Sequence, residues 1–365
     1  MNIESSFTLP SNFYTSSEIF ELEKKAIFYR CWQYIGHETQ LVNPGDYLTS
    51  QICDESILVI KGDDQKLRAF YNTCRHRGHE LLTKPAGNIK RNIICPYHSW
   101  CYHTDGSLLN ANGAEGQPNL DHQKLSLVNV QVENFFGFVF VNLDPKAKKL
   151  SEIAKDFGED LTSRIPFLGQ LMKPRENFSF SELAAGWKVV VDNFVECYHC
   201  QSAHPTFSTL TDLKDYQLDT FENWSRQMSY KTKSENKAYP FDSQQGFQGM
   251  VFWYLWPNTF ISVFPGVDEI SVISVRPIAT DRVRFDGHLL ITKNERHIDR
   301  ALFVNNFLRP EDAGICVSVQ KGLKSSSYVQ GPYVVNHKFP NLGEKGLYHF
   351  HQKVLEHLNP ILHEL

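Results

Sequence analysis

The stretch that decides the fold reads Cys74-Arg-His-Arg-Gly-His79 and, further on, Cys95-Pro-Tyr-His-Ser-Trp100. Each half pairs one cysteine with one histidine, first as C-x-H and then as C-x-x-H, and 18 residues separate the two pairs. Thiolate and imidazole groups are common ligands of zinc and of iron in proteins. We therefore predict one metal centre, with the ligands Cys74, His76, Cys95 and His98.

Two kinds of metal centre accept four such ligands, and the spacing separates them. Zinc loops usually begin with a C-x2-4-C pair, whereas the first pair here is C-x-H. In a Rieske [2Fe-2S] cluster two cysteines hold one iron and two histidines hold the other, so each mixed pair can reach both irons. We favour the Rieske cluster, which accepts electrons at a higher potential than an all-cysteine cluster, and keep a zinc-stabilised interaction module as the alternative.

The sequence around these loops shows two different residue patterns. From about residue 40 to 145, short β-rich runs alternate with Gly, Asp and Asn turns, which predicts a compact all-β module. Before it, residues 17–34 have helical apolar spacing, and after it helical and strand patterns are mixed. Helical patterns cover 150–166, 187–199, 296–307, 311–325 and 344–358, and strand patterns cover 249–265, 269–276 and 282–292.

The later strand patterns alternate between apolar and polar residues, which suits an antiparallel sheet with one buried face. Helices and strands are not interleaved as βαβ units, and no G-x-G-x-x-G follows a strand, so a dinucleotide-binding fold is not indicated. We predict an α+β protein, in which an all-β domain of residues 40–148 is inserted into a second domain of residues 1–39 and 149–365.

Composition narrows the class of protein. The 365 residues carry a net charge of -4, which gives no reason to expect a nucleic-acid partner. No apolar run is long enough to span a bilayer and the N-terminus lacks a signal-peptide pattern, so we expect no membrane partner and a cytoplasmic location. In a reducing compartment cysteines are ligands or buried thiols, and we predict that Cys197 and Cys200 are buried thiols in a helix and not a redox pair.

A second group of candidate ligands lies between residues 186 and 205. Two histidines and a carboxylate form the facial triad of non-haem Fe(II) sites, which leaves positions open for O2. His199 and His204 are five apart and would lie on different faces of a continuous helix, so we expect the helix to end between them, helped by Pro205. Glu196 lies three residues before His199, on the same helical face, and can orient its ring. Two core histidines are the plainer alternative.

Taken together, these motifs resemble the oxygenase (alpha) component of Rieske non-haem iron oxygenases over most of the chain. One branch of this family acts on quaternary ammonium compounds and includes carnitine, choline, glycine-betaine and stachydrine oxygenases. The sequence is similar to that branch in Glu196 and in the motifs Glu-Cys-Tyr-His-Cys and His-Pro. Many ring-hydroxylating members have Asp at this position. The resemblance implies a Rieske domain inserted into a helix-grip catalytic domain, a homotrimer, and a separate flavin/iron-sulfur reductase that supplies electrons from NAD(P)H.

The resemblance also assigns further roles. It implies that Asp312 completes the mononuclear Fe(II) site, with Glu311 as the second choice; Pro310 followed by two acids is also ordinary chemistry for the start of a helix. It implies that Glu196 bridges the Rieske cluster of one subunit to the iron of the next, with His98 as the ligand from which the electron leaves.

Aromatic residues supply candidates for the substrate pocket. The faces of aromatic rings attract cations, and quaternary ammonium groups are recognised in this way. A dense aromatic run lies in the predicted sheet, where only every second ring can face one pocket, and core packing is the plainer alternative. The candidates are Trp253 and Trp256 from this run, and Phe194 and Phe207, which lie next to the helix with the candidate ligands.

The predicted activity is hydroxylation, with O2, of a carbon next to the nitrogen of a small quaternary ammonium or betaine substrate, followed by N-demethylation or C–N cleavage. One alternative is a Rieske dioxygenase of aromatic rings. Another is a non-catalytic Rieske electron carrier, which would contain no mononuclear iron.

Overall fold

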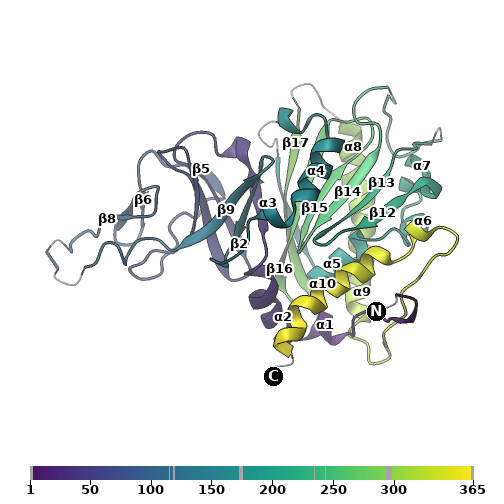
Figure 1. The fold of residues 1–365 in the computed structure, drawn as a ribbon, viewed down its shortest axis with the longest axis horizontal. Coiled ribbons are helices and arrows are strands. Elements are labelled where there is room, and N and C mark those ends of the chain that lie inside the picture. Colours follow the sequence, from purple (N-terminus) through teal and green to yellow (C-terminus); the bar gives the residue numbers. More distant parts are fainter. Residues whose placement is uncertain are drawn as a thin grey trace. The chain divides into compact units, whose positions relative to one another are not determined.

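The computed structural model describes residues 3–114, 116–117, 120–171, 176–233, 235–242, 244–292 and 298–362. The chain forms two compact units (Figure 1): Phe28–Gly158 is one, and Met1–Ile27 with Glu159–Leu365 is the other. The first unit therefore interrupts the second in sequence, and the predicted limits 40 and 148 lie inside its bounds. Within the described residues, no helix has the length and apolar character needed to cross a membrane.

The unit Phe28–Gly158 is built from antiparallel strands. Its larger sheet has the order β1-β10-β9-β4-β3-β2-β5, and its smaller sheet has the order β6-β7-β8. It starts before residue 40 because β1 pairs with β10. The strands are β1 (Gln33–His37), β2 (Asp46–Ile52), β3 (Glu55–Lys61), β4 (Leu67–Tyr71), β5 (Ala86–Asn88), β6 (Ile93–Ile94), β7 (Cys101–Tyr102), β8 (Leu108–Asn110), β9 (Asn129–Phe135) and β10 (Phe138–Asn142).

The other unit contains one antiparallel sheet with the order β11-β17-β16-β15-β14-β13-β12. One unit combines an antiparallel sheet with helices and the other consists mainly of antiparallel strands, which confirms the predicted α+β class. Its strands are β11 (Glu176–Leu183), β12 (Gln217–Thr220), β13 (Trp224–Ser229), β14 (Met250–Leu255), β15 (Thr259–Val263), β16 (Glu269–Ala279) and β17 (Arg282–Ile291).

Three helices position the site of this unit. The central helix α5 (Trp187–Phe194) packs against β16 and lies beside α9 (Arg309–Gly322) and α10 (Lys345–Leu362). The long helix α10 buries Leu347, Phe350 and Val354, whose spacing forms one apolar stripe. The other α-helices of the described residues, in both units, are α1 (Asn12–Thr15), α2 (Ser17–Glu23), α3 (Leu150–Ile153), α4 (Lys155–Arg164), α6 (Cys200–Ala203), α7 (Phe207–Leu210) and α8 (Ile298–Phe303).

Three predicted helices differ from the observed ones. The pattern 17–34 predicts one helix, but α2 ends at Glu23, a π-helical turn covers Lys24–Phe28, and Gln33 and Tyr34 belong to β1. The pattern 187–199 predicts one helix, but α5 ends at Phe194. The pattern 296–307 starts in residues outside those that the structure describes, and its described part is α8 followed by a π-helical turn, Val304–Leu308. A buried ion pair also ties α2 to α5, because Glu23 binds Lys188 and accepts the Nε1–H of Trp187 at 2.7 Å.

Candidate metal centres and substrate pocket

The two Cys–His loops of the unit Phe28–Gly158 share one backbone conformation. In each loop the cysteine N–H donates to the carbonyl oxygen five residues later, and the N–H four residues later donates back to the cysteine carbonyl. The residue at that fourth place has a positive φ, +73° at Gly78 and +59° at Ser99. The four bonds are Cys74 N to His79 O, Gly78 N to Cys74 O, Cys95 N to Trp100 O, and Ser99 N to Cys95 O.

The side chains of these loops are arranged in two layers. The Cys74 and Cys95 thiols are buried and form no disulfide, whereas the rings of His76 and His98 are more exposed, with centroids 4.7 Å apart. Trp100 stacks on His76 at 4.8 Å. Burial raises the pKa of the Cys74 thiol, so an iron ion would be the group that holds it as a thiolate. Two buried thiols beside two more exposed imidazoles fit a cluster in which the thiolates would hold one iron and the imidazoles the other.

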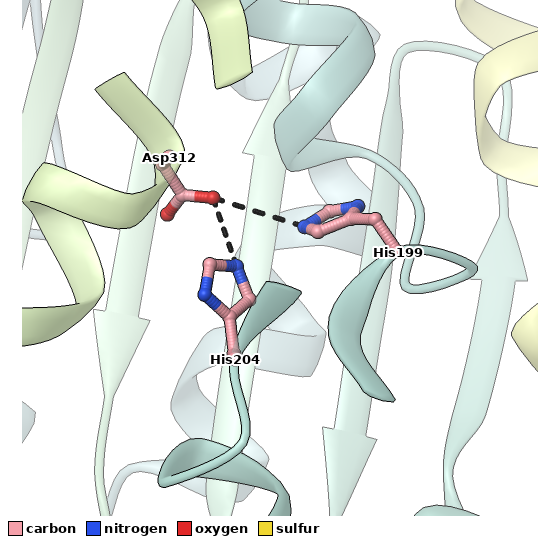
Figure 2. A group of neighbouring side chains, drawn as sticks. All are labelled: His199, His204 and Asp312. Atoms are coloured by element: carbon pink, nitrogen blue, oxygen red, sulfur yellow. Dashed lines mark ion pairs between the residues drawn. The ribbon is translucent and has the colours of Figure 1, made fainter. Parts of the chain in front are cut away.

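The second candidate centre lies in the other unit, where three side chains point toward one another (Figure 2). Candidate ligand atoms of His199, His204 and Asp312 all lie within 4.8 Å of one another. Oδ1 of Asp312 is 3.7 Å from Nε2 of His199 and 2.9 Å from Nε2 of His204. His199 and His204 flank the short helix α6, and Asp312 lies in the first turn of α9. Two imidazoles and a carboxylate form a facial set for Fe(II).

The hydrogen bonds around this centre indicate which nitrogen of each histidine ring carries the proton. Nδ1 of His204 lies 2.8 Å from Glu311 Oε2, and Nδ1 of His199 lies 2.5 Å from Glu196 Oε1. Because carboxylates only accept, each Nδ1 carries the proton and each Nε2 presents a lone pair to the site. Oδ1 of Asp312 is buried and accepts no hydrogen bond from the described residues. The amide nitrogen of Asn193 lies 3.4 Å from Nε2 of His199, and the convergence of two imidazole nitrogens and one carboxylate oxygen fits a metal cation.

The charges agree with a cation site. Burial by itself would lower the pKa of His204, but Asp312 and Glu311 outweigh it and raise that pKa. Glu311, the second choice for the third ligand, lies on Nδ1 of His204, the side of the ring opposite the three converging atoms. It is therefore placed to orient the ring and not to complete the set.

The loop between α5 and α6 corrects one prediction. Cys197 and Cys200 do not remain separate thiols in a helix, because they form a disulfide with α-carbons 4.9 Å apart. The chain leaves helical geometry after Phe194, and the turn that follows brings the two cysteines together. Glu196 nevertheless contacts His199 as expected, from a turn and not from a helical face.

A pocket of about 500 Å³ opens onto the three candidate ligands. Phe194 and Phe207, predicted from their place next to the candidate ligands, line it. The rings of Phe194 and Phe260 stack with centroids 4.0 Å apart. The six phenylalanines of the lining are Phe194, Phe207, Phe252, Phe260, Phe264 and Phe285.

Trp253 and Trp256 do not line this pocket, which corrects two further predictions. On β14 neighbouring side chains face opposite sides of the sheet, so Phe252 faces the pocket and Trp253 faces away, where its Nε1–H donates to Asp160 Oδ2 at 2.8 Å. Trp256 follows the strand and packs in the core, 6.3 Å from Trp187. The alternation along the strand predicts that only one of two neighbouring rings faces the pocket, but the sequence does not say which one.

Comparison with known proteins matches both units. Residues 31–124 match the model of the Rieske [2Fe-2S] domain, and residues 171–359 match that of the ring hydroxylating alpha subunit (catalytic domain). The oxygenase subunit of carnitine monooxygenase from Acinetobacter pittii is 37% identical over 98% of this chain and 96% of its own length. Chloroplastic choline monooxygenase from Spinacia oleracea is 28% identical over 95% of this chain and 77% of its own length.

Solved structures of other proteins have a similar fold. The quaternary ammonium Rieske monooxygenase CntA in complex with L-carnitine has a TM-score of 0.86 and 36% identity, covering 98% of this chain and 97% of its own. Naphthalene 1,2-dioxygenase, at 19% identity and a TM-score of 0.80, shares the fold. With both domain models matched and close relatives along nearly its whole length, this chain belongs to the Rieske non-haem iron oxygenases, as an oxygenase alpha subunit.

Proposed function

We propose that this chain is an oxygenase component that uses O2 and electrons from a separate reductase to hydroxylate a carbon next to the nitrogen of a quaternary ammonium compound. The observation that carries the proposal is the facial set of His199, His204 and Asp312 at the wall of a pocket with six phenylalanines. Such rings attract a cation that has no N–H to donate. The relatives named for carnitine and choline oxidation support the same substrate class.

The residues of the two centres then take separate roles. Cys74, His76, Cys95 and His98 hold the [2Fe-2S] cluster, which receives the electrons, and the three-residue set holds Fe(II), which supplies the O2 chemistry when bound. Glu311 and Glu196 keep the protons of the two imidazoles on Nδ1, so that each Nε2 stays available as a ligand. The phenylalanines exclude water and hold the ammonium group.

The overall reaction balances with two electrons. One oxygen atom of O2 enters the substrate as a hydroxyl group, and the other leaves as water with two protons and two electrons. The hydroxylated carbon loses its hydroxyl proton, forms a carbonyl group and releases the tertiary amine as the C–N bond breaks. A methyl carbon would yield formaldehyde, and a carbon of a longer arm would yield trimethylamine and an aldehyde.

We also propose an oligomer, in which Glu196 links two subunits. One solved relative, 35% identical to this chain, is described as showing inter-subunit electron transfer. The Glu196 carboxylate already holds Nδ1 of His199, and we propose that it also meets the partner subunit's His98. A head-to-tail trimer closes such heterologous contacts into a ring. The proposed reductase carries flavin and an iron-sulfur cluster and draws on NAD(P)H.

A substrate screen tests the proposal. The purified oxygenase with a reconstituted NADH-dependent reductase is supplied with carnitine, γ-butyrobetaine, glycine betaine, choline and naphthalene, and trimethylamine and formaldehyde are measured. Turnover of a quaternary ammonium compound supports the proposal. Oxidation of naphthalene alone would favour a ring dioxygenase, and a protein that contains the cluster but no third iron would be an electron carrier.

A further inference from the structure

The last turn of α5 carries residues of the pocket and, beside them, a carboxylate that faces other helices. Asn193 and Phe194 line the pocket, and the amide nitrogen of Asn193 lies 3.4 Å from Nε2 of His199. The side chain of Asp192 instead contacts side chains of α1 and α10. The helix ends at Phe194, and the last carbonyl groups of a helix have no intrahelical partner, so this turn is the part of α5 that frays most easily.

Three side chains from distant segments form a hydrogen-bond network with Asp192. Nε2 of His351 in α10 lies 3.0 Å from Oδ1 of Asp192, and Tyr14 of α1 donates its hydroxyl proton to Oδ2 at 2.7 Å. Because a carboxylate only accepts, Nε2 of His351 carries the proton, and Nδ1 of the neutral ring accepts from the Tyr333 hydroxyl at 2.7 Å. The hydrogen bonds therefore run in one direction, from Tyr333 through His351 to Asp192.

The donors of this network are buried. Tyr14 is 5% exposed, Tyr333 is 6% exposed and His351 is 1% exposed, so water does not compete freely for their hydrogen bonds. Burial, together with the charge of Asp192, raises the pKa of both tyrosines, and each keeps its hydroxyl proton at neutral pH. Hydrogen bonds to an ionised carboxylate are stronger than those between neutral groups. Asp192 is therefore held firmly, by one donor on each oxygen.

A second pair of hydrogen bonds holds the backbone of the same turn. The Tyr216 hydroxyl donates to Oε1 of Gln227 at 3.0 Å, and Nε2 of Gln227 donates to the carbonyl oxygen of Phe194 at 2.5 Å. That carbonyl is one of those that the end of a helix leaves without an intrahelical partner. Tyr216 and Gln227 line the pocket, whereas none of the residues that hold Asp192 belongs to its lining among the described residues. The turn is therefore fixed both from within the pocket and from outside it.

We propose that His351 is a positioning residue, which acts through Asp192 to fix the last turn of α5 at the candidate iron site. Without this hold the turn frays, and Asn193 moves relative to the ligand His199. Five of the six phenylalanines of the pocket lie on other elements, so substrate binding changes less than turnover does. The effect on turnover rests on the proposed function, whereas the effect on the helix end does not.

Three variants of α10 test the contact with Asp192. His351→Phe removes both the donor to Asp192 and the acceptor of the Tyr333 hydroxyl proton. His351→Gln offers an amide N–H close to the place of the Nε2–H, so it can keep the bond to Asp192. His349→Phe is the matched control, because His349 lies two residues earlier, on the opposite side of α10, near the backbone of Phe221.

Hydrogen–deuterium exchange of the purified, iron-loaded oxygenase measures fraying at the Val195 amide, which donates to the Val191 carbonyl oxygen at the end of α5. We expect exchange about 10- to 100-fold faster in His351→Phe, a smaller change in His351→Gln and none in His349→Phe. The EPR spectrum of the nitric oxide complex of the iron should change in His351→Phe alone. With the substrate found in the screen, His351→Phe should lower kcat about 10- to 100-fold and change KM less than about threefold.

Unchanged exchange at Val195 in His351→Phe overturns the positioning role. Faster exchange with an unchanged EPR spectrum and a normal kcat also overturns it, because the network would then serve stability alone. If the wild-type protein oxidises no quaternary ammonium compound, the proposed function fails, and exchange and EPR still decide the role of His351. If His351→Phe does not fold, Tyr14→Phe replaces it, since it removes the donor to the other carboxylate oxygen and should speed exchange at the same amide.

Discussion

The carboxylate of Glu196 is held from two directions, and one of them is His199. Oε1 lies 2.5 Å from Nδ1 of His199, and Oε2 accepts the backbone N–H of Tyr198. The Glu196 side chain is therefore fixed against the ring of a candidate iron ligand. This geometry orients the imidazole and places a charged group at the back of the site.

Glu196→Gln tests this relationship. Glutamine keeps the length of the side chain but loses the charge that favours a proton on Nδ1, so we expect turnover to fall by at least about 10- to 100-fold. The visible spectrum of the Rieske cluster should persist. Steady-state turnover with reductase and the cluster spectrum are measured together, with the exposed Glu222→Gln as control. Near-normal turnover in Glu196→Gln would contradict both the orienting and the bridging role.

Asp312 and Glu311 are neighbours with different expected roles. Asp312→Ala removes a converging ligand, so the purified variant should lose the mononuclear iron and keep the iron and sulfide of the cluster. Glu311→Gln keeps an acceptor but removes the negative charge beside Nδ1 of His204, so iron should still bind, about 10- to 100-fold more weakly. Iron and acid-labile sulfide are assayed per chain. If Glu311→Gln abolished iron binding while Asp312→Ala kept it, the assignment of the third ligand would be reversed.

Phe252 and Trp253 form a matched pair on opposite faces of β14. Phe252→Leu removes a ring from the pocket, and we expect KM for a trimethylammonium substrate to rise about 3- to 30-fold with a small change in stability. Trp253→Phe removes the hydrogen bond to Asp160 and should cost about 1 kcal/mol of folding free energy without changing KM. Kinetics and urea unfolding of both variants are compared. A KM effect confined to Trp253→Phe would mean that the other face binds substrate.

The buried pair of Glu23 and Lys188 predicts a pH-dependent effect on stability. Burial raises the pKa of Glu23, while Lys188 opposes that rise. Lys188→Met leaves the carboxylate unpaired and should cost about 3–5 kcal/mol at pH 8. The folded variant then binds a proton at Glu23 more tightly than the unfolded chain does, so its deficit should shrink as the pH falls toward 5. Urea unfolding at both pH values measures this, and a deficit independent of pH would mean that Glu23 does not take up the proton.

Short-range relations of this chain follow from its sequence. The paired Cys74–His76 and Cys95–His98 loops and the contact of Glu196 with His199 depend on residues a few positions apart, so motif spacing predicts them. The predicted helix end between His199 and His204 is wrong, because α5 ends earlier, at Phe194, and the short helix α6 lies between the two histidines. The α+β class also follows, because hydrophobic periodicity differs between helix and strand.

Contacts between residues that are far apart in the sequence could be identified only from the tertiary structure. Glu311 lies 107 residues from the histidine that it orients, and the carboxylate of Asp312 reaches the same centre from the same helix. Which face of β14 meets the pocket depends on the register and packing of the sheet, because a shift by one residue exchanges Phe252 for Trp253. The Cys197–Cys200 disulfide is local in sequence, but it depends on the turn that the chain makes after α5 ends at Phe194, and the helical pattern of the sequence does not predict that turn.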